Sequence, residues 1–152
     1  MNILDAISGS IRYYSDDYMI VKLLGHASVY VRVGNQNILM DPWLSDSLLG
    51  RFRRFPDPGP LNFEIPDPDL VLLSHHHWDH VHIPTLARLN KRTQFLIPKN
   101  DQLKRILEIL DFNDVQEVEP WQKTVFPWGN LWPTESRVPF GEVGFKIGRA
   151  HV

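Results

Sequence analysis

Apolar and polar positions alternate with short breaks in the first part of the chain, in a pattern that favours β-strands. Three runs of β-branched and apolar side chains share this character: residues 18–24 (YMIVKLL), 28–33 (SVYVRV) and 37–40 (NILM). Gly25 ends the first run, and Gly34-Asn35 between the second and third runs is a turn signal. The pattern predicts an antiparallel three-stranded meander that ends at Asp41-Pro42.

The segment that follows has a different character. Residues 44–69 contain five prolines and two glycines, a density that neither a helix nor a central strand tolerates. The sequence therefore predicts a long loop without secondary structure. A loop of this length inside a compact domain is more often functional than accidental.

The pattern changes again after this loop. Residues 69–74 (DLVLLS) form a continuous apolar run, which is typical of a strand buried on both faces. The other expected elements are helices over residues 84–90 and after a cap at Asn100 or Asp101, and strands over residues 94–97 and 115–118. Strands that alternate with helices predict an α/β domain.

Composition excludes several classes of protein. The 152 residues suffice for one domain with a core, and a net charge of -2 argues against extended nucleic-acid binding. The absence of cysteine excludes disulfides and thiolate zinc sites. The first twenty residues lack a signal-peptide pattern, and the apolar runs are too short for a membrane span. We therefore expect a cytoplasmic protein that acts on a small molecule, with no prediction of its oligomeric state.

Candidate metal ligands are concentrated in one segment. Residues 74–82 read SHHHWDHVH and hold five of the seven histidines. At the end of a buried strand, His75 and His77 point the same way, because alternate side chains share a face. The turn that follows would bring Asp79 and His80 to the same cavity. Imidazole and carboxylate are zinc-type ligands, so the spacing predicts two adjacent metal positions. An affinity tag would instead lie at a terminus, without the interrupting Trp and Asp.

These residues carry a family resemblance. His75-x-His77-x-Asp79-His80 resembles the His-x-His-x-Asp-His signature of the metallo-β-lactamase superfamily. Gly-His-Ala-Ser at residues 25–28 and Asp-Pro-Trp-Leu at residues 41–44 look like elements of one branch of it. That branch contains proteins similar to ascorbate-6-phosphate lactonase, N-acyl phosphatidylethanolamine phospholipase D and CMP-sialate hydroxylase. The resemblance covers about residues 18–121.

The resemblance implies both a fold and a chemistry. The fold would be the N-terminal half of an αββα sandwich with a metal site at one edge. His75 and His77 would bind the first metal and Asp79 and His80 the second, with two zinc ions expected and manganese or iron as alternatives. A metal-activated water would attack an ester, lactone, amide or phosphodiester of a small metabolite. Asp79 would also be catalytic, because its equivalent orients that hydroxide.

Other residues near these motifs have less specific interpretations. His26 has either a role beside the metals or a structural hydrogen-bonding role. Asp41 is expected to form hydrogen bonds near residues 74–82, which we call the metal loop. His76 should point away from the metals, and His82 either supports them or packs structurally. The three arginines of the proline-rich loop form either a solvated surface or a clamp for a substrate phosphate. These are Arg51, Arg53 and Arg54.

The resemblance also implies ligands that this sequence does not supply. The family completes its two metal sites downstream with a third His, a bridging Asp and a last His, whereas His151 is the only histidine after His82. Residues 147–152 are what ATC GGA AGA GCA CAC GTC encodes, which resembles a common sequencing adapter. We therefore expect a partial domain over residues 1–146, followed by adapter read-through that includes His151. The alternative is that residues 145–152 form a genuine strand that delivers the third His. The parent protein would be the active enzyme, and the fragment as written would be inactive.

Two other functions agree with the same motif. One is an iron-binding member of the fold that performs redox chemistry, and the other is a non-catalytic metal-binding module. Metal analysis distinguishes the redox function, because iron would favour it and zinc or manganese would favour hydrolysis.

Overall fold

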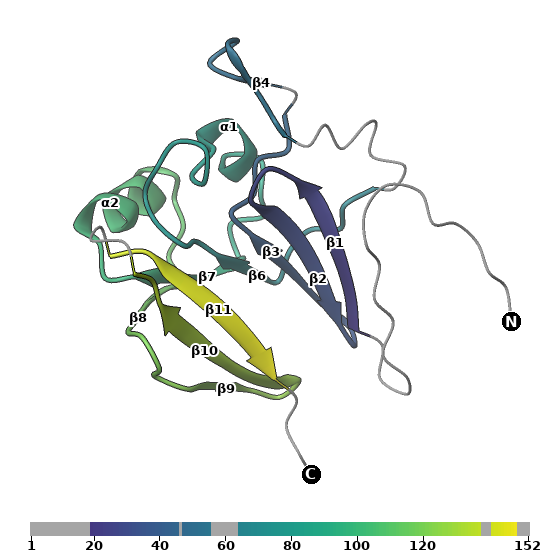
Figure 1. Ribbon diagram of the computed structural model, residues 1–152, viewed down its shortest axis with the longest axis vertical. Coiled ribbons are helices and arrows are strands. Elements are labelled where there is room, and N and C mark those ends of the chain that lie inside the picture. The colour runs from purple at the N-terminus through teal and green to yellow at the C-terminus, as the bar shows by residue number, and fades with distance from the viewer. Residues whose placement is uncertain (1–18, 46, 56–63, 138–140, 149–152) are drawn as a thin grey trace, which may run out of the picture.

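A mixed six-stranded sheet forms the centre of the molecule (Figure 1). The computed structural model describes residues 19–45, 47–55, 64–137 and 141–148. The sheet has the order β1-β2-β3-β6-β7-β8. Its strands are β1 (Met19–Gly25), β2 (Ser28–Val33), β3 (Gln36–Met40), β6 (Leu70–Leu72), β7 (Gln94–Pro98) and β8 (Val115–Val118). The first three pair antiparallel, and β3, β6, β7 and β8 are parallel to one another.

The central sheet is covered on both faces. Helices α1 (Ile83–Leu86) and α2 (Asp101–Ile109) pack on one face, where Leu86, Leu103 and Leu107 join its buried side chains. A second, antiparallel sheet packs on the other face, where Leu131 is fully buried. It consists of β9 (Thr124–Phe126), β10 (Gly129–Glu135) and β11 (Val143–Gly148). One helical layer and two sheets are three layers of an αββα sandwich, which confirms the predicted fold.

Strand β6 shows why the sequence runs apolar without alternation. Leu70 and Leu72 point into the cluster beneath the second sheet, whereas Val71 and Leu73 point into the cluster beneath the helices. All four side chains are at most 3% exposed. The strand therefore needs apolar side chains on both faces, as its sequence predicted.

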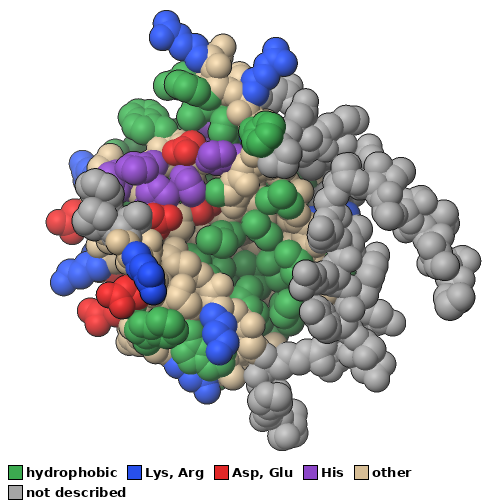
Figure 2. Space-filling view, in the orientation of Figure 1, with side chains coloured by type: hydrophobic (Ala, Val, Ile, Leu, Met, Phe, Trp, Pro, Cys, Tyr) green, Lys and Arg blue, Asp and Glu red, His purple; other side chains and the backbone are tan. Residues whose placement is uncertain are grey.

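The second sheet does not cover the whole face of the first. Met19 and Val21 on β1 and Val29 on β2 pack against its core but stay only partly buried. Figure 2 shows a hollow lined by hydrophobic side chains on this face of the molecule.

Two sequence predictions need correction. The helix expected over residues 84–90 ends at Leu86. The chain continues in turns because Arg88 N–H donates to Thr85 O and Leu89 N–H to Leu86 O, three residues back instead of four. The loop expected to lack secondary structure contains a short hairpin of β4 (Ser47–Leu48) and β5 (Phe52–Arg53).

The remaining elements agree with the sequence where it made a prediction. The meander of β1 to β3 is confirmed, and Asn100 caps α2 by accepting a hydrogen bond from Leu103 N at 2.9 Å. Ile147 and Gly148 of the suspected adapter segment pair with β10 as part of β11, whereas His151 lies outside the described residues. Among the ranges described, no helix has the length and apolar character needed to cross a membrane.

Candidate metal centre

The site lies where two parallel strands end side by side. Asp41 follows β3 and Ser74 follows β6, and Asp41 N–H donates to Leu72 O at 2.9 Å. The buried Asp41 carboxylate accepts hydrogen bonds from Ser74 N at 2.7 Å and from Ser74 Oγ at 2.6 Å. This pair fixes the start of the loop that carries the candidate ligands.

The same two residues orient two histidines. His80 Nδ1 lies 2.8 Å from Asp41 Oδ2, and His75 Nδ1 lies 2.9 Å from Ser74 Oγ. Asp41 can only accept, and Ser74 Oγ already donates to it, so each histidine carries its proton on Nδ1. The lone pair of each imidazole is therefore on Nε2. Metal-binding histidines in proteins are held in this way by partners on their second nitrogen.

His75 and His77 face each other, as the sequence predicted for alternate positions. His75 Nε2 and His77 Nδ1 are 2.9 Å apart, and the His75 side chain is buried. Two imidazole nitrogens that converge at this distance offer two ligand atoms to a single ion.

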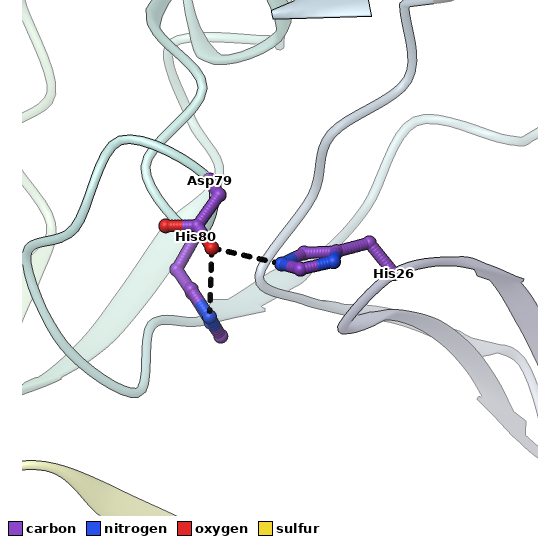
Figure 3. A group of neighbouring side chains, drawn as sticks. All are labelled: His26, Asp79 and His80. Carbon is purple, nitrogen blue, oxygen red and sulfur yellow. Dashed lines mark hydrogen bonds and ion pairs between the residues drawn. The ribbon is translucent and has the colours of Figure 1, made fainter. Parts of the chain in front are cut away.

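A second group lies beside this pair (Figure 3). His26 Nε2 is 2.9 Å from Asp79 Oδ2, and His80 Nε2 is 3.7 Å from the same oxygen. One ligand atom from each of the three residues lies within 4.8 Å of the others. Figure 2 shows the histidine side chains gathered with acidic ones on one face, below the end that carries the β4–β5 hairpin.

The donor atoms fit a metal ion. Zinc bonds to nitrogen and oxygen of about 2.0–2.1 Å place two ligands of a tetrahedral ion about 3.3 Å apart. The distances of 2.9 Å and 3.7 Å lie on either side of this value. Imidazole and carboxylate donors suit zinc, manganese and iron alike, so the donor set does not select one metal.

The electrostatics of the loop give the buried His75 and the partly buried His80 opposite pKa shifts. Burial lowers the pKa of His75, and the neighbouring His80 lowers it further, although Glu142 opposes this. Burial also lowers the pKa of His80, but the hydrogen bond and charge of Asp41 outweigh it and raise the pKa above its usual value. Burial raises the pKa of Asp79, but the hydrogen bond from His26 and other interactions outweigh it and lower the pKa. Asp79 is therefore a carboxylate near neutral pH.

The two histidines without a motif match have other partners. His82 Nδ1 caps α1 by accepting from Thr85 N at 3.2 Å, and its ring stacks on Trp43. Its buried position therefore has a structural explanation. His76 turns toward α2, where its Nδ1 lies 3.4 Å from Asn100 Nδ2.

The three arginines of the loop separate into different environments. Arg54 is buried and its Nη1 donates to Leu24 O at 2.9 Å and Trp43 O at 3.5 Å, so this side chain anchors the hairpin to the fold. Arg51 and Arg53 are exposed. Of the three, only Arg53 lines the cavity of about 420 Å³ that opens beside the candidate ligands.

Sequence reasoning missed two contributors to the site. Ser74 precedes the motif directly, but its contact with Asp41 spans 33 residues and depends on the pairing of β3 with β6. Glu142 directly precedes β11, whose first residue Val143 donates its N–H to Ser74 O at 3.0 Å. Its Oε1 lies 3.8 Å from His75 Nδ1. No local signal in the sequence distinguishes this glutamate from others.

The layers of sheet and helix and the His/Asp loop define an α/β protein with a candidate metal site at the carboxyl ends of its parallel strands. The chain belongs to the family described as the beta-lactamase superfamily domain, whose profile matches residues 20–144. The metallo-β-lactamase fold and the family predicted from the His/Asp signature are thereby confirmed.

The curated relatives include a metal-dependent hydrolase and a hydroxylase. The chain is 40% identical over 133 residues to a UPF0173 metal-dependent hydrolase of Methanopyrus kandleri, covering 82% of this chain and 52% of that protein. It is 31% identical over 117 residues to a 4-amino-L-phenylalanyl-[peptidyl-carrier-protein] 3-hydroxylase of Streptomyces venezuelae, covering 69% of this chain and 21% of that protein. The chain thus spans about half or less of these relatives.

Solved structures agree on the fold. The diiron β-hydroxylase CmlA of Streptomyces venezuelae superposes with a TM-score of 0.67 at 22% identity, over 90% of this chain and 28% of that one. A putative metal-dependent hydrolase of Parabacteroides distasonis gives a TM-score of 0.64 at 13% identity, over 93% of this chain and 62% of that one. The fold thus occurs with both hydrolase and hydroxylase chemistry.

Proposed function

We propose that these residues form the metal centre of a hydrolase that cleaves an ester, lactone, amide or phosphodiester bond of a small metabolite. The observation that carries the proposal is the orientation of His75 and His80. Buried partners hold both Nδ1 atoms, so both Nε2 lone pairs are available to a metal. The relative of Methanopyrus kandleri, a metal-dependent hydrolase by name, supports the same class of reaction.

Each residue has a specific part in this proposal. His75 and His77 would hold one ion, and Asp79 and His80 a second, with His26 placed to ligate or to orient Asp79. A bound metal would supply a Lewis acid and a water of lowered pKa. Asp79, ionised near neutral pH, would orient the attacking water and take part in its deprotonation.

Metal binding is the first test. The 152-residue chain is stripped of metal and titrated with zinc by calorimetry, beside His77→Ala and the control His76→Ala, which removes a neighbouring histidine whose Nδ1 is turned toward Asn100. We expect His77→Ala to weaken zinc binding at least tenfold, because one of the two ligands proposed for the first ion is lost. His76→Ala should leave zinc affinity unchanged. Equal affinities in all three proteins would refute the assignment.

Activity is the second test and uses the full reading frame amplified from the source DNA. Zinc-loaded and manganese-loaded protein is assayed on p-nitrophenyl esters, bis-p-nitrophenyl phosphate and a homoserine lactone. Asp79→Asn should lower kcat by about a hundredfold or more. Turnover that survives both Asp79→Asn and chelation would contradict a metal-dependent reaction.

The similarity to the Streptomyces hydroxylase favours one second candidate, an iron enzyme with redox chemistry. His and carboxylate ligands suit iron as well as zinc. Metal analysis of protein expressed with equal supplies of zinc, manganese and iron distinguishes the two. A predominance of iron with a ligand-to-metal absorption band would favour the redox function over hydrolysis.

A further inference from the structure

A cavity of about 420 Å³ connects the candidate metal loop with the β4–β5 hairpin. His77 and Asp79 line the cavity on the side of the metal loop, and Phe52 and Arg53 line it from the hairpin. A molecule in this cavity would touch both the reacting centre and the hairpin, so the side chains of the hairpin can select what reaches the metals.

The hairpin is fixed relative to the metal loop. Arg51 N–H donates to Leu48 O at 3.1 Å across a tight turn in which Leu49 and Gly50 both have positive φ, of 52° and 68°. This turn matches the twist of a two-stranded hairpin. At its base, Phe55 O accepts from His26 N at 3.1 Å. The hairpin is therefore bonded to the same turn that carries a candidate ligand.

The apolar part of the cavity lies at the surface. Phe52 is 61% exposed and Trp78 is 64% exposed, and both line the cavity together with the buried Trp43. Large apolar side chains that are exposed around a concavity are typical of ligand sites, because a ligand removes this surface from water. The lining therefore favours a ligand with an apolar body.

The charge in the cavity adds a second requirement. The exposed Arg53 guanidinium forms no ion pair with any residue that the structure describes. Arginine binds phosphate-type and carboxylate oxyanions through paired N–H donors. Arg53 lines the same cavity as the apolar side chains and the candidate ligands His77 and Asp79, so a ligand with an anionic group and an apolar body could contact all three kinds of side chain.

We propose that this cavity is a binding site for amphipathic anions, in which Arg53 holds an oxyanion headgroup and Phe52 and Trp78 contact the apolar body. The inference rests on the proposed function only in that the bond to be cleaved would lie on the side of Asp79. It assigns the recognition of the substrate to the hairpin and specifically to one of the three arginines of the loop.

The test uses non-hydrolysable probes and metal-free protein, so that a metal cannot hold the anion. Ethylphosphonate, hexylphosphonate, hexanoate and hexyltrimethylammonium are titrated into the 152-residue chain by calorimetry. We expect affinity to rise about twofold per methylene, half of the logarithmic gain of full burial, or about sixteenfold from ethyl to hexyl. The hexyl ammonium should bind at least tenfold more weakly than the hexyl anions. Phosphonate and hexanoate compared directly show which oxyanion Arg53 prefers.

Matched variants locate the headgroup. Arg53→Gln should weaken hexylphosphonate binding about tenfold, the loss of a charge-assisted hydrogen bond. Arg51→Gln, on the same hairpin but outside the cavity, should leave it unchanged. Phe52→Ala should reduce the gain per methylene without changing the affinity for ethylphosphonate. Each variant is first matched to the parent chain by its melting temperature, and Arg53→Lys provides a charge-retaining substitute if Arg53→Gln unfolds.

The outcomes separate this inference from the proposed function. Equal effects of Arg53→Gln and Arg51→Gln, or equal binding of the anionic and cationic hexyl probes, would overturn the amphipathic-anion site even if zinc binds normally. Phosphonate binding that depends on Arg53 would support it even if zinc binding failed and the proposed hydrolase with it.

Discussion

Replacing Asp41 with asparagine tests how the metal loop is held, because one buried carboxylate orients both the start of the loop and a candidate ligand. Asp41 is 1% exposed, and its two oxygens accept from Ser74 N, Ser74 Oγ and His80 Nδ1 at 2.7, 2.6 and 2.8 Å. Asparagine has nearly the same shape and tolerates the positive φ of 42° at this position. The substitution therefore changes charge and hydrogen bonding with little effect on the backbone.

The expected magnitude follows from the donors that asparagine cannot satisfy. If its amide oxygen keeps the bond from Ser74 N, its NH₂ group faces Ser74 Oγ and His80 Nδ1. His80 can then accept only by moving its proton to Nε2, the atom that a metal would need. A lost hydrogen bond to a charged group costs about 1.5–3 kcal/mol of unfolding free energy. Loss of such an orienting partner lowers metal affinity about 10- to 100-fold.

Two measurements check this prediction. Urea unfolding of the metal-free protein gives the loss in unfolding free energy, and zinc titration gives the loss in affinity. Asp69→Asn is the control, because the exposed Asp69 carboxylate also accepts a backbone hydrogen bond, from Asn37 N at 2.8 Å, but outside the site. Zinc affinity of Asp41→Asn within twofold of the parent would refute the orienting role.

The pH dependence of the same variant gives an independent check. Burial lowers the pKa of His80, but the hydrogen bond and charge of Asp41 outweigh it, so the pKa of folded His80 lies above the usual 6.5. The stabilisation by protonated His80 is fully present below the pKa of the unfolded state and is lost as pH rises through the folded pKa. Asp41→Asn should therefore destabilise the protein more at about pH 5 than at about pH 9. An equal loss at both would contradict the charge interaction.

Three further substitutions separate structural from metal-binding roles. His82→Ala should cost about 1 kcal/mol or more of unfolding free energy, because His82 caps α1, yet leave zinc affinity unchanged by calorimetry. Leu131→Ala, in the fully buried contact between the two sheets, should cost about 2–5 kcal/mol in urea unfolding, and a loss below about 1 kcal/mol would contradict that packing. Glu142→Gln removes a partly exposed charge 3.8 Å from His75 and should weaken zinc binding about two- to fivefold, whereas unchanged affinity would exclude the charge from the site.

The elements that could be predicted from the sequence are those whose pattern lies within the element itself. Strand β6 is apolar throughout because it is buried on both faces, and α2 carries a cap at Asn100 and apolar positions on one side. Strand β10 lacks such a signal because Pro133 lies within it. The structure tolerates Pro133 because β9 pairs with β10 only as far as Leu131, and beyond that Trp121 N–H donates to Pro133 O. This compensation depends on how β9 and Trp121 lie beside β10, so the sequence pattern alone could not reveal it.

The hairpin of β4 and β5 was missed for a related reason. Its strands have two residues each, and its turn places Leu49 at a positive φ that leucine rarely adopts. Neither strand length nor turn residue matches the usual hairpin signature. The contacts that hold the hairpin, from Arg54 to Leu24 O and from His26 to Phe55 O, connect separate segments of the chain.

The candidate site, too, could be predicted only where it depends on local spacing and not where it depends on long-range contacts. Four candidate ligands were named from a six-residue spacing, whereas their supports come from three other segments: Asp41 after β3, His26 between β1 and β2, and Glu142 before β11. Two of these supports, His26 and Asp41, have positive φ values of 54° and 42°, which residues other than glycine adopt at a cost. Hydrogen bonds to the metal loop hold both residues, so the fold stabilises their backbones in these conformations. The candidate ligand atoms thereby lie at distances close to those that a metal ion would require, so metal binding would mainly replace protons rather than move the chain.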